Sequence, residues 1–145
     1  MKCGRTSQGA TSDARRCCRH QAIIWYLADD PRLSPSAASA SDRASASGDP
    51  ILIPSITLVE LTYLVEKGRL PAAARQRLVE ALADADGPYE LAPLDGDAAE
   101  AVQRIDRAAV PDLPDRAIAA TALAWNAPLV SRDAKIQAAL LQTIW

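Results

Sequence analysis

Four acidic residues stand out because each lies at the start of an expected helix or among apolar neighbours. Asp112 and Asp115 are three residues apart, just before an alanine-rich apolar run, and Asp133 follows a short apolar segment. Glu60 lies within the apolar stretch 57–63. An unpaired buried carboxylate is unfavourable, so Glu60 should bind a metal, pair with a cation or point into a cleft. Carboxylates suit Mg²⁺ and Mn²⁺, and the pattern predicts a divalent-metal site that cuts a phosphodiester.

Each acid also has a purely structural interpretation. Asp112, Asp115 and Asp133 are placed where carboxylates cap helix N-termini and interact favourably with the helix dipole. Glu60 could be an ordinary glutamate on a helix surface. The interpretation as a site therefore depends on the acids converging, since the starts of helices and the ends of strands can meet at one edge of a sheet.

Four further polar residues flank these acids in the sequence. Ser131 and Thr121 are candidates for hydrogen bonds to water or substrate, and Arg116 and Arg132 are candidates for phosphate contacts. Both arginines have an equally simple interpretation as solvated surface residues. These are the predicted substrate-binding residues of the site.

Composition excludes several classes of protein. A chain of 145 residues with 49% hydrophobic residues fits one domain with a real core. A net charge of −2 argues against a nonspecific nucleic-acid binder. The chain shows no apolar run of the roughly 20 residues that a bilayer requires and no apolar secretion segment near its start, so we expect a cytoplasmic protein without a membrane. The cysteines at 3, 17 and 18 and the single histidine, His20, lack zinc-site spacing, and no phosphate-binding glycine motif is present.

The apolar runs and turn formers predict alternating strands and helices. After a first core segment at 23–27, we expect a weak surface helix at 34–48, strands at 51–54, 89–94, 128–130 and 143–145, and helices at 55–67, 71–85 and 97–108, from 114 and from 133. The helix at 55–67 is apolar nearly all round and should be buried on most sides. Alternation of this kind predicts an α/β fold, a three-layer α/β/α sandwich around a parallel sheet of about four to five strands.

Four segments resemble, in order and spacing, PIN-domain proteins and in particular VapC-type toxins of bacterial type II toxin–antitoxin systems. These segments are TLVEL at 57–61, VPDLPDRAIAATA at 110–122, PLVSRD at 128–133 and TIW at 143–145. The resemblance covers about residues 22–145. It implies a PIN-like fold and a Mg²⁺-dependent endoribonuclease, with Mn²⁺ as a substitute ion. It also implies an RNA substrate, a homodimer and a cognate antitoxin that silences the enzyme.

The resemblance also assigns the acids and reveals one departure. Glu60, Asp115 and Asp133 match three members of the family's acidic quartet as catalytic metal ligands, and Asp112 is a neighbour that assists catalysis. The family's first strand ends in an aspartate just before a segment like IIWYL. In this chain Arg19 occupies that position. A cation there should repel Mg²⁺ rather than bind it.

Residues 1–20 differ from the rest of the chain. They are polar, rich in Arg, Ser and Cys, and without helical or strand periodicity, so we expect an aberrant, disordered segment before a PIN-like domain at 21–145. A frameshift explains the departure. With suitable codons, DARRCCRH at 13–20, read one base later, gives Met-Arg-Val-Ala-Ala-Val-Asp-Thr, an apolar strand that ends in the missing aspartate.

Three hypotheses for function follow. The chain is an active ribonuclease, or it is a PIN scaffold that has lost catalysis through Arg19 and only binds antitoxin or RNA. The third is a small α/β domain whose acids merely cap helices. The last would make the order of the motifs accidental.

Overall fold

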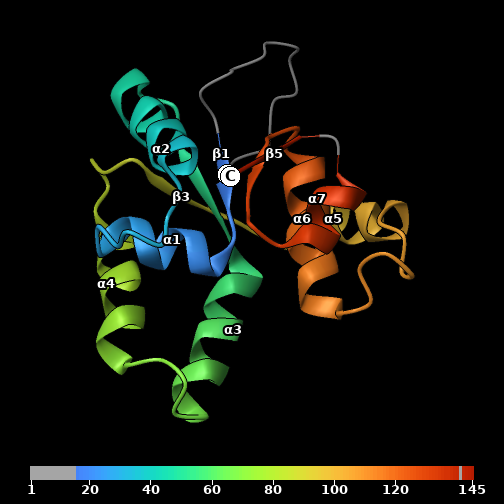
Figure 1. Ribbon diagram of the computed structural model, residues 1–145, viewed down its shortest axis with the longest axis horizontal. Helices are drawn as coiled ribbons and strands as arrows, with labels where there is room; N and C mark the ends of the chain where they lie inside the picture. The colour runs from blue at the N-terminus through green and yellow to red at the C-terminus, as the bar shows by residue number, and fades with distance from the viewer. Residues whose placement is uncertain (1–15, 141) are drawn as a thin grey trace.

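Figure 1 shows the computed structural model, in which residues 16–140 and 142–145 are described. Strands and helices alternate along most of the chain, as the sequence pattern predicts. In chain order the elements are β1 (Arg16–Cys18), α1 (His20–Leu27), α2 (Pro35–Ser47), β2 (Ile51–Pro54), α3 (Ser55–Glu66), α4 (Ala72–Ala83), β3 (Tyr89–Ala92), α5 (Gly96–Ala101), the 3₁₀ helix η1 (Val102–Arg104), α6 (Leu113–Ala124), β4 (Leu129–Val130), α7 (Ala134–Ala139) and β5 (Thr143–Ile144).

The five strands form one parallel sheet in the order β3-β2-β1-β4-β5. The central strand β1 is short but is paired on both sides, because Cys17 pairs with Leu52 of β2 and with Leu129 of β4. In Figure 1, α1, α2 and α4 lie on one side of the sheet, and α5, α6 and α7 lie on the other. This confirms the predicted α/β fold with a parallel central sheet.

The sheet is buried on both faces, and successive strand residues contribute to opposite halves of the core. Cys17 and Leu52 belong to the half that includes Ile118 of α6. Cys18 belongs to the half that includes Ile23 of α1. Strands buried on both faces read as continuous apolar runs rather than as alternating patterns, and this explains ILIP at 51–54. Since all strands run in the same direction, their carboxyl ends meet at one edge of the sheet.

The structure corrects the prediction for the part of residues 1–20 that it describes. Residues 16–18 form β1 in the middle of the sheet, and α1 begins at His20. Cys17 and Cys18 are 0% and 1% exposed. Cysteine behaves as a small apolar residue when it is buried, so two adjacent cysteines suit a strand covered on both faces. Residues 1–15 lie outside the described residues, and the frameshift stays a prediction about the coding DNA.

Helix α2 is less superficial than its Ala- and Ser-rich sequence predicts. The Ser34 side chain caps its first turn by accepting a hydrogen bond from the Ala37 amide, and Gly48 ends it with a φ of 80°. Ala37, Ala40 and Ala44 are fully buried. Small side chains let this helix approach β1 and β2 closely.

Helix α3 is more exposed than its apolar sequence predicts. Thr57 and Leu61 are fully buried, but Val59 is 62% exposed and Tyr63 is 55% exposed. In Figure 1 the carboxyl half of α3 projects beyond the sheet, so only the first turns have a partner on several sides. Within the described residues, no helix has the length and apolarity needed to cross a membrane.

Candidate functional site

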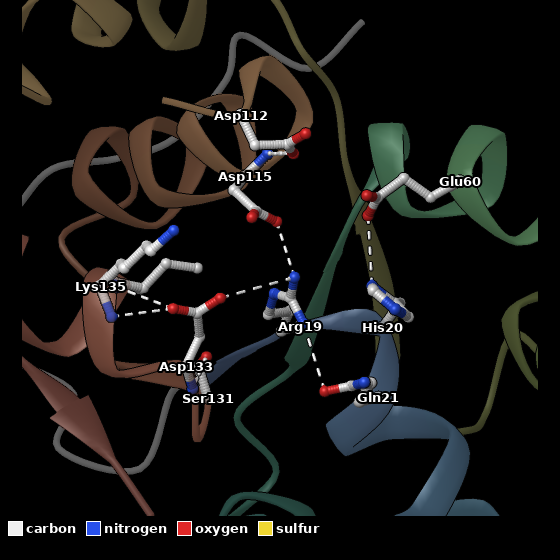
Figure 2. Close-up of polar contacts among 10 residues, drawn as sticks. Arg19, His20, Gln21, Glu60, Asp112, Asp115, Ser131, Asp133 and Lys135 are labelled. Carbon is white, nitrogen blue, oxygen red and sulfur yellow. Dashed lines mark hydrogen bonds and ion pairs between the residues drawn. The ribbon is translucent and has the colours of Figure 1, made fainter. Parts of the chain in front are cut away.

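The predicted acids gather at the carboxyl edge of the sheet. Helix α3 begins immediately after β2 and carries Glu60, while Asp133 follows β4 by three residues. The first turn of α6, which carries Asp112 and Asp115, packs near α3. Figure 2 shows these side chains directed toward one another, with Arg19 from the end of β1 among them.

Glu60, Asp112 and Asp115 form what we call the three-acid cluster. Each offers a carboxylate oxygen, and these oxygens all lie within 4.8 Å of one another. The Glu60 and Asp115 side chains are 17% and 14% exposed, whereas Asp112 is exposed. Three carboxylate oxygens at this spacing form a donor set for a hard divalent cation, because Mg²⁺ and Mn²⁺ favour oxygen ligands.

Asp112 is also the N-cap of α6. Its Oδ2 accepts a hydrogen bond from the Asp115 backbone amide at 3.1 Å. Pro114 lies within the first turn of the helix, where its missing amide hydrogen leaves no bond unmade. Capping therefore fixes the distance between Asp112 and Asp115, so the structural and functional interpretations of this acid are compatible.

Asp133 points toward the same group of side chains but does not belong to the three-acid cluster (Figure 2). Its Oδ1 caps α7 by accepting hydrogen bonds from the Lys135 and Ile136 amides at 2.8 and 3.3 Å. The Ser131 hydroxyl oxygen accepts a hydrogen bond from the Asp133 amide at 3.0 Å. The other carboxylate oxygen, Oδ2, lies 3.9 Å from the Arg19 Nη2 atom. The positively charged Arg19 side chain thus links Asp133 to Asp115.

Arg19 is the positive charge at the centre of this arrangement. Its Nη2 donates to Asp115 Oδ1 at 2.7 Å, and its Nη1 donates to Gln21 Oε1 at 3.3 Å. The Arg19 side chain is 12% exposed. The family resemblance predicts an aspartate where this chain has Arg19, and the structure places the Arg19 guanidinium between Asp115 and Asp133 (Figure 2).

Sequence reasoning missed His20 as a neighbour of the site. Its Nδ1 lies 3.2 Å from Glu60 Oε1, off the direction of a hydrogen bond, and neither atom has a hydrogen-bond partner among residues 16–140 and 142–145. The available signal was its position directly after Arg19, at the end of the central strand. Glu60 is therefore neither free at the surface nor fully paired, which leaves an oxygen for a further ligand.

The pKa of Asp115 reflects the balance of charges in the pocket. Burial raises the pKa of this carboxyl above its ordinary value of 3.8, and the neighbouring Asp112 and Glu60 carboxylates raise it further. The Arg19 guanidinium acts in the opposite direction without reversing the shift. The surroundings of Asp115 therefore favour its protonated form more than water does.

The predicted substrate-binding residues differ in their placement. Thr121 is 1% exposed, and its hydroxyl donates to the Ala117 carbonyl within α6, so it faces the core. Arg116 donates from Nη2 to the carbonyls of Val102 and Ile105 and ties η1 to α6. The Thr121 hydroxyl and the Arg116 Nη2 atom are thus both engaged in hydrogen bonds within the protein.

Ser131 and Arg132 lie on the segment between β4 and Asp133. Ser131 is 1% exposed and uses its hydroxyl to hold Asp133, so it positions an acid rather than a substrate. Arg132 is exposed, and its guanidinium stacks 4.6 Å from the centre of the Trp25 ring. Of the four predicted residues, Arg132 is the one whose charged group is presented outward.

Acidic side chains at the carboxyl edge of a parallel sheet define a class of α/β proteins suited to holding hard cations. The chain matches the PIN domain family model over residues 21–139 and belongs to the PIN domain family. A search of curated protein sequences found no significant match.

Three solved structures are similar in fold to this chain. VapBC2 from Rickettsia felis, bound to a DNA fragment from the promoter, has a TM-score of 0.64 at 19% identity, covering 90% of this chain and 99% of that chain. A toxin–antitoxin complex from Klebsiella pneumoniae has a TM-score of 0.62 at 22% identity, covering 90% and 96%. FitAcB from Neisseria gonorrhoeae has a TM-score of 0.56 at 19% identity, covering 88% and 95%.

Proposed function

We propose that this chain is a metal-dependent endoribonuclease, the toxin component of a type II toxin–antitoxin system. PIN domains are generally nucleases, and the chain is similar in fold to proteins solved as toxin–antitoxin complexes. The observation that carries the proposal is the three-acid cluster at the carboxyl edge of the sheet. It gathers negative charge where a nuclease of this fold needs a cation.

The residues present fit a hard divalent ion, with one change from the predicted ligand set. Glu60, Asp112 and Asp115 would hold Mg²⁺ or Mn²⁺, and Asp133 is separated from them by Arg19. Asp112 therefore takes the ligand role that the sequence assigned to Asp133. An ion bound there supplies Lewis-acid stabilisation of phosphate charge and lowers the pKa of a bound water.

The chain's own residues have distinct roles in this proposal. Capping by Asp112 and the packing of α6 on α3 hold the acids at fixed spacing before any ion binds. Without a cation the acids would repel the RNA backbone, because phosphates are also anionic. Arg132, directly before Asp133 in the chain, is proposed to offer an exposed positive charge to a phosphate of the RNA.

The partners follow the same proposal. A cognate antitoxin is supported by the toxin–antitoxin complexes among the similar folds. We also propose a homodimer, as the family resemblance implies, and a cytoplasmic location.

RNA cleavage by matched variants tests the proposal. Purified wild-type chain and the variants Glu60→Gln and Glu66→Gln are incubated with a mixture of labelled RNAs in Mn²⁺, Mg²⁺ or EDTA. Glu66 is an exposed acid on the same helix and serves as the control. We expect cleavage by wild type and by Glu66→Gln that requires the divalent ion, and loss of at least 100-fold in Glu60→Gln. Equal cleavage by Glu60→Gln, or cleavage unaffected by EDTA, would refute the assignment.

A second candidate function is favoured by Arg19. A guanidinium in contact with Asp115 suits a PIN scaffold that binds antitoxin or RNA without cutting. The same experiment separates the two, because the scaffold would bind RNA in a mobility-shift assay and leave it intact at every Mn²⁺ concentration.

A further inference from the structure

We propose that Arg19 is an internal competitor for the metal ion, so that a divalent cation binds the three-acid cluster only by displacing the Arg19 guanidinium from Asp115. The inference rests on the proposed function in one respect, that the same acids bind a divalent ion. It adds that the metal affinity of this chain is set by a residue that is not itself a ligand.

The backbone fixes where the Arg19 side chain begins. Its amide donates to the Val130 carbonyl at 3.2 Å, and its carbonyl accepts from the Ile23 amide at 3.1 Å. Arg19 is therefore held between the central part of the sheet and the first turn of α1. From this anchored position the side chain extends into the acidic pocket, where it is 12% exposed (Figure 2).

The charges around Arg19 explain why it stays in the pocket. The carboxylates of Asp115 and Asp133 lie 2.7 and 3.9 Å from Nη2. A guanidinium keeps its positive charge at any ordinary pH, and no deprotonation can remove it from competition. The fixed charge therefore partly neutralises the acids that a metal ion would otherwise neutralise.

A metal ion bound to the Asp115 carboxylate would lie close to the Arg19 guanidinium and be repelled by it. A carboxylate oxygen lies about 2.1 Å from a bound Mg²⁺, and two cations that share one oxygen repel each other strongly. The Asp115 oxygen nearest to Arg19 already accepts its hydrogen bond at 2.7 Å.

The hold on Arg19 is also incomplete. Its Nε has no hydrogen-bond partner in the described part of the chain, and its contact with Gln21 is 3.3 Å long. A buried donor without a partner makes the occupied state less favourable. Displacement into solvent would satisfy Nε, so the guanidinium can leave when an ion of higher charge competes for Asp115.

Calorimetric titration with Mn²⁺ tests the proposal on Arg19→Gln, Arg19→Lys and wild type. Arg32→Gln is the matched control, because Arg32 forms an ion pair with Asp30 at 2.8 Å on the surface. We expect Arg19→Gln to bind Mn²⁺ at least tenfold more tightly than wild type, a change of 1.4 kcal/mol. Arg19→Lys, which keeps the charge, should gain less, and Arg32→Gln should stay within twofold. Equal Mn²⁺ affinity in wild type and Arg19→Gln would overturn the proposal.

A measurement on the wild-type chain covers the case in which the Arg19 variants do not fold. Thermal melting in EDTA checks folding, and the guanidinium ¹⁵N signals of arginine are then followed in wild type during Mg²⁺ titration. We expect the Arg19 signals to change together with the Asp115 amide signal as the ion binds. Saturation of the Asp115 signal with the Arg19 signals unchanged would show that the ion and the guanidinium do not compete.

RNA cleavage separates failure of this inference from failure of the proposed function. Tight Mn²⁺ binding by Arg19→Gln without RNA cleavage would support the competition and contradict the ribonuclease. Cleavage that requires Mn²⁺ at the same concentration in wild type and Arg19→Gln would support the ribonuclease and contradict the competition.

Discussion

Asp112 combines two roles that two substitutions can separate. It caps α6 through a hydrogen bond of 3.1 Å from the Asp115 amide, and it offers an oxygen to the three-acid cluster. Asp112→Ala removes both the cap and the charge. Asp112→Asn removes the charge but keeps an oxygen that can cap the helix, because Asn is as good an N-cap as Asp.

The expected stabilities differ between the two variants. Both variants lose the charge and only Asp112→Ala loses the cap, so its free energy of unfolding should be about 1 kcal/mol below that of Asp112→Asn. In Asp112→Asn, loss of the favourable dipole interaction removes about 0.3–1 kcal/mol. Relief of repulsion acts oppositely, since charges about 5 Å apart interact by roughly 0.8 kcal/mol in water and about 3 kcal/mol at a dielectric constant of 20. Asp112 is exposed, so the lower figure applies and the net change is within about 0.5 kcal/mol.

Urea denaturation in EDTA and Mn²⁺ titration together test this reasoning. The titration is made in the Arg19→Gln background, where the starting affinity is expected to be higher. Both Asp112 variants should bind Mn²⁺ at least tenfold more weakly than their parent. Equal stability of Asp112→Ala and Asp112→Asn would refute the capping role, and parental Mn²⁺ affinity in Asp112→Asn would remove Asp112 from the ligands.

Three further predictions concern other residues. Thr57 is fully buried and its hydroxyl has no hydrogen-bond partner among the described residues. Thr57→Val should therefore raise the free energy of unfolding by about 1 kcal/mol. A lower free energy of unfolding, measured by urea denaturation, would contradict this. Arg116→Lys should lower the free energy of unfolding by about 1–2 kcal/mol, because the hydrogen bonds to the Val102 and Ile105 carbonyls are lost. It should leave RNA affinity unchanged. Weaker RNA binding at wild-type stability would instead indicate that Arg116 contacts phosphate. The raised pKa of Asp115 means that the folded state binds the proton more tightly than the unfolded state. The protonated Asp115 carboxyl therefore contributes stability to the folded state below pH 3.8, and this contribution is lost as the pH rises through the pKa of the folded state. The free energy of unfolding of Asp115→Asn should consequently increase relative to that of wild type between pH 3.5 and neutrality. A relative loss over that range would mean that the Arg19 attraction outweighs burial.

The sequence was sufficient to predict elements whose character is set by their own residues and immediate neighbours in the chain. The run ILIP at 51–54 is buried on both faces of the sheet, and its apolar pattern with flanking turn formers indicated a strand. Asp133 was predicted to begin a short helix and caps α7. Local chemistry determines both features, so a short window of sequence contains the necessary information.

Features that depend on distant neighbours could not be predicted in this way. Strand β1 has the sequence Arg-Cys-Cys, and only the strands on either side of it make that sequence a buried strand. The direction of the Thr121 hydroxyl depends on the rotation of α6, which places this residue in the core. The contact between Arg19 and Asp115 joins residues 96 positions apart, and no local pattern indicates it.

The most direct test of the account is a crystal structure of the chain soaked in Mn²⁺, with the ion located by its anomalous scattering. We expect one anomalous peak bounded by the carboxylates of Glu60, Asp112 and Asp115, with the Arg19 guanidinium moved away from Asp115. A peak held by other residues, or an Arg19–Asp115 contact that persists beside a bound ion, would contradict it.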